Sequence, residues 1–254
     1  MGHTGTLDPF ATGLLLVLVG RVTRLARFLT ALDKQYTGVI TLGAATETDD
    51  KTGPPIATSE RYRDLSDADL AAAAAGLVGT YAQRPPAYSA RKVGGQRAYR
   101  LARRGTPADL TPRDVRVHAF ALGLRNGDSV PFRTTVSSGT YVRALARDLG
   151  DALGCGAHLR ALRRTAIGPF DVADAVSLDA LAEGTACLRA PRDAVRHLPA
   201  VAIDAARRAD VLHGRPVASD TGYGGAVALV ADDELVAVAE PGRGGLQPRV
   251  VLAE

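Results

Sequence analysis

The sequence predicts an α+β protein that ends in a small β-rich module. Two extended stretches, residues 115–124 and 130–136, are separated by Asn126-Gly127-Asp128, which is a hairpin signal. Apolar residues recur at helical spacing in other segments, which indicates amphipathic helices. From about Leu198 the chain changes to short apolar runs split by Gly, Asp and Pro, which is typical of a small β-rich unit.

The N-terminal part predicts alternating strands and helices. Residues 13–20 predict a buried strand, and the helical spacing of Val22, Leu25, Phe28 and Leu29 predicts a helix after it. The β-branched residues 35–42 predict a strand that ends at Gly43.

The middle of the chain predicts two helices and a loop. Ser66 caps a helix over residues 67–77, and the acidic first turn suits the helix dipole. Arg84-Pro85-Pro86 excludes helix and central sheet, so residues 88–90 are expected on an extended loop. Residues 140–153 predict a helix that ends at Gly154, and residues 162–170 predict an extended segment.

The tail predicts a helix over residues 205–212 and three short strands. A boundary is expected near residues 191–199. The expected strands are residues 226–230, 235–239 and 249–253.

Composition indicates a globular chain of 254 residues, because 46% hydrophobic residues are ample for a buried core. The apolar run 14–19 is too short for a membrane span. Cys155 and Cys187 form no CxxC pair, the histidines do not cluster at metal-ligand spacing, and His158 near Cys155 is interpreted as packing. We therefore expect a cytoplasmic protein without a metal or cofactor.

Basic residues are concentrated between residues 70 and 108, where no acidic residue occurs, although the net charge is only +4. Three tyrosines, Tyr81, Tyr88 and Tyr99, alternate with them. This composition suits phosphate contacts and base stacking, and it suits a solvated helical face equally well. The basic residues are Arg84, Arg91, Lys92, Arg97, Arg100, Arg103 and Arg104.

Asp8 lies before Pro9 in a glycine-rich stretch near the start of the chain. Gly5 and Gly13 permit unusual backbone angles around it. Such an aspartate is either a turn residue or a carboxylate held at the edge of a cleft, and the dipeptide alone does not decide between them.

Five motifs, in order, resemble the TruB family of tRNA pseudouridine synthases. They extend from Gly2 to about Phe170. The motifs are GHTGTLDPFATGLL from Gly2, DKQY with LG from Asp33 to Gly43, TETDD from Thr46, QRPPAYSARK from Gln83 with residues onward to Gly105, and SSGTYVR from Ser138 with GCGAHLRALRR from Gly154.

The resemblance implies a pseudouridine synthase fold, with a mixed, mainly antiparallel central sheet and flanking helices, and isomerisation of the T-loop uridine at tRNA position 55. By resemblance Asp8 is the nucleophile, and it is ionised at pH 7 without an activating histidine. Arg143 is expected to hold its carboxylate with a guanidinium fork. Tyr36 is expected to lie against the target base and to remove a proton late in the reaction.

The resemblance also implies residues that bind the substrate. His3 is expected to brace the loop from which the base is extruded, and Tyr141 and Leu162 to contact the substrate, although both also suit packing. The basic segment is then expected to grip the RNA backbone, through Arg84, Arg91, Lys92, Arg97 and Arg103.

The resemblance implies two domains, a catalytic domain over residues 1–190 and a PUA-like RNA-binding module over residues 198–254. We expect a monomer that binds the T arm of tRNA. Family members usually carry some tens of residues before the first motif, whereas Met1 stands directly before Gly2 here. Either the chain is truncated or its start codon is misassigned, and misassignment is the preferred hypothesis.

Two other functions remain open on these residues. One is a non-catalytic RNA-binding or tRNA-folding protein on the same scaffold. The other is a hydrolase that uses Asp8 and the acidic residues 46–50, with magnesium. The set Asp8, Tyr36 and Arg143 favours the synthase over the RNA-binding protein. The sequence has no phosphate-binding P-loop and no second well-placed catalytic carboxylate, which weakens the hydrolase hypothesis.

Overall fold

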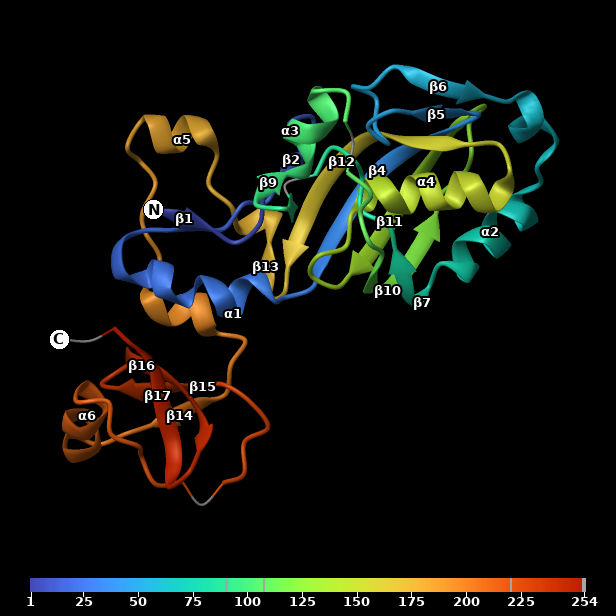
Figure 1. Ribbon diagram of the computed structural model, residues 1–254. Coiled ribbons are helices and arrows are strands. Elements are labelled where there is room, and N and C mark those ends of the chain that lie inside the picture. The colour runs from blue at the N-terminus through green and yellow to red at the C-terminus, as the bar shows by residue number, and fades with distance from the viewer. Residues whose placement is uncertain (90, 107, 220, 253–254) are drawn as a thin grey trace.

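A seven-stranded sheet forms the centre of the larger half of the molecule (Figure 1). The computed structural model describes residues 1–89, 91–106, 108–219 and 221–252. The strand order is β13-β12-β4-β11-β10-β7, with β2 beside β12. Each neighbouring pair is antiparallel except β2–β12, so the expected mixed, mainly antiparallel sheet is confirmed. The strands are β2 (Thr12–Gly13), β4 (Lys34–Leu42), β7 (Gly79–Gln83), β10 (Arg113–Leu122), β11 (Ser129–Val136), β12 (Ala157–Ile167) and β13 (Phe170–Asp171).

Two helices, α2 (Asp67–Gly76) and α4 (Val142–Leu153), cover one face of this sheet (Figure 1). A capping box between Ser66 and Asp69 begins α2, as the sequence predicts. Gly154, with φ of 66°, ends α4, and the apolar stripe of α4 packs on alternate inward residues of β4 and β11. The packed face fixes where the first turn of α4 lies.

The structure corrects two strand predictions. Residues 13–20 are not one buried strand, because the chain pairs with β12 only at β2 and then turns to form β3 (Val17–Leu18) with β1 (Gly2–His3). Strand β12 begins at Ala157, five residues before the expected start. Two register shifts within β12 break the alternation of apolar residues, which hides its first half in the sequence.

The remaining elements before the C-terminal sheet are short. Ala90, in the expected loop 88–90, and Ala253, in the expected last strand, lie outside the described residues. The remaining strands are β5 (Ala44–Thr46), β6 (Pro55–Thr58), β8 (Lys92–Val93) and β9 (Gln96–Arg97), and the helices are α1 (Ala26–Thr30), α3 (Ala98–Arg103) and α5 (Leu178–Ala182), with 3-10 turns η1 (Gly20–Leu25), η2 (Glu60–Asp64), η3 (Val172–Asp174) and η4 (Pro191–Val195).

A four-stranded sheet forms the C-terminal part, in the order β14-β15-β16-β17. Its strands are β14 (Ala200–Ala202), β15 (Val227–Ala231), β16 (Glu234–Gly242) and β17 (Gly245–Val251). Its helix, α6 (Ala205–Leu212), has the predicted bounds. Leu25 from the N-terminal helical turn is fully buried against this sheet, so α1 lies between the two halves (Figure 1). None of the helices in the described ranges combines the length and the apolar character that a membrane span requires.

Gly13, at the end of the loop between β1 (Gly2–His3) and β2, lies directly against Arg164 of β12. A Cβ at Gly13 would lie 2.2 Å from the carbonyl oxygen of Arg164, and its φ of +104° disfavours any side chain. Gly13→Ala should therefore lower the free energy of unfolding by at least about 3 kcal/mol in a urea titration.

Gly20→Ala is the matched control. Gly20 also has a positive φ, of +64°, but a Cβ at this position would meet no atom of the described residues within 4 Å. The substitution should cost only about 1 kcal/mol of backbone strain. Equal losses for the two variants would show that the contact between Gly13 and Arg164 is unimportant.

Candidate active site

The loop between β1 and β2 places Asp8 at the edge of the central sheet. A hydrogen bond from the Ala11 amide to the Asp8 carbonyl, at 2.9 Å, closes a turn around Pro9. At the far end, the Leu14 amide donates to the Arg164 carbonyl at 2.9 Å. The Asp8 side chain keeps 30% of its surface exposed, so a substrate can reach its carboxylate.

Arg143 binds both oxygens of the Asp8 carboxylate. Its Nε lies 3.0 Å from Oδ2 and its Nη2 lies 2.9 Å from Oδ1, which is a fork-to-fork ion pair. Arg143 is in the first turn of α4, 135 residues from Asp8, and its side chain is only 7% exposed. The fold thus brings together the two residues that the resemblance paired.

The same guanidinium is held from three further directions. Its Nη1 donates to the Thr48 carbonyl at 2.9 Å and lies 3.4 Å from Oδ2 of Asp50. Its Nη2 also donates to the Tyr88 carbonyl at 3.0 Å. The buried cation is therefore compensated by two carboxylates and cannot rotate without breaking several bonds.

Asp50 is a site residue to which sequence reasoning gave no role of its own, because it stood only within the TETDD motif and within the acidic segment 46–50 of the hydrolase hypothesis. Oδ1 of Asp50 accepts hydrogen bonds from Thr48 Oγ1 at 2.8 Å and from the Thr52 amide at 2.9 Å. Arg143 lies between Asp8 and Asp50, the place where the hydrolase hypothesis needs a magnesium ion, and this arrangement argues against that hypothesis. The Thr-x-Thr-Asp-Asp-x-Thr pattern is the signal that could have identified Asp50.

A second ion-pair network fixes the loop before Asp50. Arg147 Nη1 binds Asp49 Oδ2 at 2.9 Å, and the same side chain binds Asp148. Asp49 adopts φ of 58°. Burial raises the pKa of Asp49 to about 6, against the opposing attraction of Arg147 and Arg143.

Tyr36 lies in β4, opposite Arg164 of β12. Its side chain is buried. Burial raises the pKa of its phenol, the charge and hydrogen bond of Arg164 oppose this rise, and the Asp8 charge adds to it. The hydroxyl is therefore protonated at neutral pH and lies within electrostatic reach of Asp8.

The expected substrate residues lie on segments that flank this pair. His3 is exposed on β1, and its Nδ1 accepts a 3.4 Å hydrogen bond from the Gly5 amide. Tyr141 precedes α4, with its amide bound to Gln83 Oε1 at 2.9 Å. Leu162 is buried on β12, within the main core.

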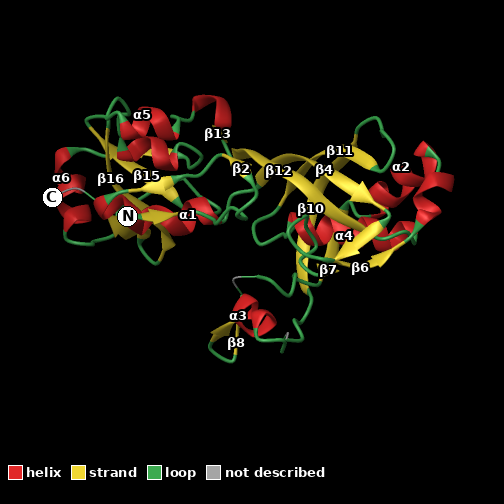
Figure 2. Cartoon of the chain, turned by 90° about the horizontal axis from the view of Figure 1, so that it is seen from above, coloured by secondary structure: helices red, strands yellow, loops and turns green. Residues whose placement is uncertain are grey.

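The expected RNA-backbone residues lie on a part that projects from the body. Strands β8 and β9 and helix α3 stand apart from the central sheet (Figure 2). Lys92, Arg97 and Arg103 are exposed on these elements, and the Arg103 guanidinium lies 5.6 Å from the Tyr99 ring centre. Arg91 Nη1 donates to the Thr111 carbonyl at 3.2 Å, and Arg84 is exposed just after β7.

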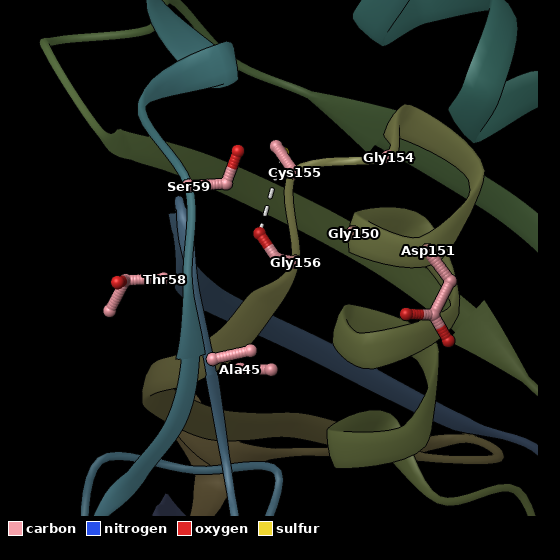
Figure 3. A pocket seen from close by; sticks show the side chains of 9 residues that line it. Ala45, Thr58, Ser59, Gly150, Asp151, Gly154, Cys155 and Gly156 are labelled. Carbon is pink, nitrogen blue, oxygen red and sulfur yellow. Dashed lines mark hydrogen bonds between the residues drawn. The ribbon is translucent and has the colours of Figure 1, made fainter.

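A cavity of about 370 Å³ lies elsewhere, between strands β5 and β6 and the end of α4 (Figure 3). Small residues such as Gly150, Gly154 and Gly156 line it. Cys155, which is buried, also lines the cavity, and the nearby His158 Nδ1 is 2.9 Å from the Ala44 carbonyl. Burial also raises the pKa of the Cys155 thiol.

The fold is shared with solved pseudouridine synthases. The chain superimposes on the crystal structure of a Cbf5-Nop10-Gar1 complex with a TM-score of 0.72 and 26% identity, covering 99% of this chain and 75% of that one. A structure of an H/ACA RNP bound to a substrate RNA containing 2'-deoxyuridine matches with a TM-score of 0.73 at 24% identity, over 100% of this chain and 76% of that one. The class is therefore that of a pseudouridine synthase fold.

Sequence comparison defines the family within that class. Residues 1–142 match the model of the TruB family pseudouridylate synthase N-terminal domain, and residues 143–200 match that of the tRNA pseudouridylate synthase B C-terminal domain. The tRNA pseudouridine synthase B of Thermobifida fusca is 44% identical over 100% of this chain and 89% of its own length. That of Aromatoleum aromaticum is 43% identical over 98% of this chain and 82% of its own. The chain belongs to the TruB family.

The raised pKa of Asp49 predicts a pH-dependent stability. Since the pKa lies near 6 in the folded state and at 3.8 in an isolated carboxyl, the folded state binds the proton more tightly. The contribution of Asp49 to stability is therefore largest below pH 4 and falls by about 3 kcal/mol as the pH rises through 6.

Asp49→Asn removes this titration, and Asn tolerates positive φ. The free energy of unfolding of the wild type minus that of the variant, measured in urea, should fall by about 2.4 kcal/mol between pH 4 and pH 7. A difference that stays constant over this range would contradict the prediction.

Proposed function

We propose that this chain converts uridine to pseudouridine at position 55 in the T loop of tRNA, with Asp8 as nucleophile. The observation that carries the proposal is the fork-to-fork pair between Asp8 and Arg143 in a chain of the TruB family. The pair holds the carboxylate in one orientation and leaves it partly exposed.

The chemistry needs a nucleophile and proton handling. The uracil leaves the ribose through N1, turns, and rejoins through C5, whose proton is then lost. Asp8 attacks either the sugar or the base, and both routes need the carboxylate in one fixed position. Tyr36 packs against the base. Its phenol first gives its proton to water, and the resulting phenolate accepts the C5 proton and so returns to the neutral phenol; the positive charge of Arg164 lowers the cost of that transient phenolate.

The uridine must leave the stacked loop before it can reach Asp8. Base extrusion costs a few kcal/mol, which contacts in the site must offset. His3 is exposed beside the catalytic loop and can stack in the vacated place. Tyr141 and Leu162 line the approach to the base from α4 and β12.

The projecting segment of β8, β9 and α3 supplies charge for the RNA arm. Its cations, with Arg84 and Arg91, bind phosphates while the stacked Tyr99 orders Arg103. We propose residues 1–190 as the catalytic domain and residues 198–254 as a PUA-like module that contacts tRNA. The protein acts as a monomer in the cytoplasm, with the T arm as its target.

Asp8→Asn tests the nucleophile. The amide has almost the same size but cannot attack as a carboxylate, so pseudouridine in the T loop of unmodified tRNA should fall below detection by nucleoside analysis. Asp33→Asn is the matched control, because Asp33 is half-exposed and binds His118 at 3.1 Å. It should leave product formation unchanged.

Arg143→Lys tests whether the orientation of the Asp8 carboxylate matters in addition to the positive charge beside it. Lysine keeps the positive charge but binds one oxygen, so the single-turnover rate should fall about 100-fold while tRNA affinity changes less than about twofold.

Equal product from the wild type and Asp8→Asn would refute the role of Asp8 as nucleophile. Tight tRNA binding without any product from the wild type would favour the non-catalytic RNA-binding function.

A salt titration tests the RNA-backbone residues. In the double variant Arg97→Ala with Arg103→Ala, the slope of log affinity against log salt should be shallower by about one for each residue. Arg61→Ala with Arg63→Ala is the control, because both are exposed arginines on η2, beside α2 and not α3. An unchanged slope in the first variant would remove Arg97 and Arg103 from the RNA interface.

A further inference from the structure

The largest side chain that is fully buried in the described part of the molecule is that of Arg164, with 1% exposure. The mechanism above uses Arg164 only through its charge. Besides its hydrogen bond with Tyr36, its guanidinium donates to two main-chain carbonyls, whereas an arginine at this depth is usually paired with an acidic group.

These hydrogen bonds join the two ends of the catalytic loop. Nε donates to the Leu14 carbonyl at 2.7 Å, and Nη2 donates to the Gly5 carbonyl at 3.0 Å. Asp8 lies between these two points. The main chain of Arg164 adds a third tie, because its carbonyl accepts from the Leu14 amide at 2.9 Å.

Arg164 also stands beside Tyr36. The two residues face each other in the register of β12 and β4, and Gly13 faces Arg164 from β2. One residue of β12 therefore touches the loop that carries Asp8 and the strand that carries Tyr36.

The positive charge of Arg164 is electrostatically unfavourable for the neighbouring Lys34. Lys34 is also buried, and its ammonium donates to the carbonyls of Thr30 and Leu32. Burial, and then the charge of Arg164, lower the pKa of Lys34 to about 8. A neutral side chain in place of Arg164 would avoid the repulsion of Lys34. The hydrogen bonds from Arg164 to the Gly5 and Leu14 carbonyls are the interaction that offsets this repulsion.

We propose that Arg164 is a positioning residue that holds the Gly5 and Leu14 ends of the catalytic loop in one geometry relative to Tyr36, and so sets the distance over which Asp8 acts. Arg164 is too deeply buried to touch RNA. Its effect reaches the reaction only through the loop and the tyrosine, and it rests on the proposed roles of Asp8 and Tyr36.

The test compares Arg164→Lys with the wild type in single-turnover reactions on unmodified tRNA. Lysine keeps the charge but cannot reach both carbonyls from one planar group. Since a displacement of about 1 Å can cost about 100-fold in rate, the rate constant at saturating protein should fall about 10- to 100-fold, with the tRNA dissociation constant within about twofold.

Arg160→Lys is the control, because Arg160 is exposed on the same strand and binds Ser129 Oγ at 3.0 Å, away from the loop. It should match the wild type in both quantities.

Hydrogen exchange reports on the loop itself. In Arg164→Lys the Leu14 and Ala11 amides should exchange faster, while amides of α4 keep their protection. If Arg164→Lys is not recovered folded, Arg164→Gln, which can bind one carbonyl, carries the same measurements.

Three outcomes would overturn the inference. They are a wild-type rate in Arg164→Lys, a loss of rate matched by an equal loss of affinity, and a failure of both variants to fold, which would make Arg164 a requirement of the fold alone. A failure of the proposed function can be told apart from a failure of this inference. In that case the wild type would form no pseudouridine, while the hydrogen-exchange rates would still report on the loop.

Discussion

The ion pair between Asp8 and Arg143 is the interaction on which the rest of the site depends. Arg143 is buried, so its charge must be compensated, and Asp8 and Asp50 do this from two sides. Removing one partner of such a buried group leaves an unpaired charge that costs about 3–5 kcal/mol. The same contacts that stabilise the guanidinium fix the carboxylate that we propose as the nucleophile. Stability and function thus share one set of hydrogen bonds, which constrains every segment that supplies them.

Four distant segments meet at Arg143, and the central sheet determines where each arrives. Helix α4 packs its apolar stripe on β4, β11 and β12, which fixes the position of its first turn. The loop at Thr48 is bound to β12, because the Lys51 amide donates to the Leu159 carbonyl and the Leu159 amide to the Asp49 carbonyl. The Tyr88 carbonyl follows β7, and Asp8 reaches the site through the pairing of β2 with β12. The polar cluster therefore depends on segments that several different strands of the sheet hold in place.

Local patterns in the sequence predicted the regular elements, and the contacts between distant segments explain what was missed. The capping residue Ser66, the hairpin around Gly127 and the β-branched residues of β4 are local signals, and all three predictions are confirmed. The strand over residues 13–20 was wrong because its apolar residues do not all enter the core, and Val17 is 52% exposed. Asp50 and Arg164 were missed for another reason. Their partners lie 93 and 150 residues away, so a local pattern such as the one around Asp50 does not show which distant group a buried charge contacts.

The C-terminal sheet also bears on the catalytic loop, through the short connection between them. The loop ends at Leu14, held by Arg164, and η1 begins only six residues later at Gly20. Leu25 at the end of η1 is buried among Val230, Val238 and Val250, and Arg24 Nη1 donates to the Val251 carbonyl at 2.7 Å. The segment after the catalytic loop is therefore anchored at one end by the central sheet and at the other by the C-terminal sheet. Between these anchors the segment also pairs with the start of the chain, since Val17 and Leu18 of β3 face His3 and Gly2 of β1. Arg164 binds Leu14 through both its side chain and its main chain, so the loop that carries Asp8 is held at the point where the chain leaves it towards the C-terminal sheet.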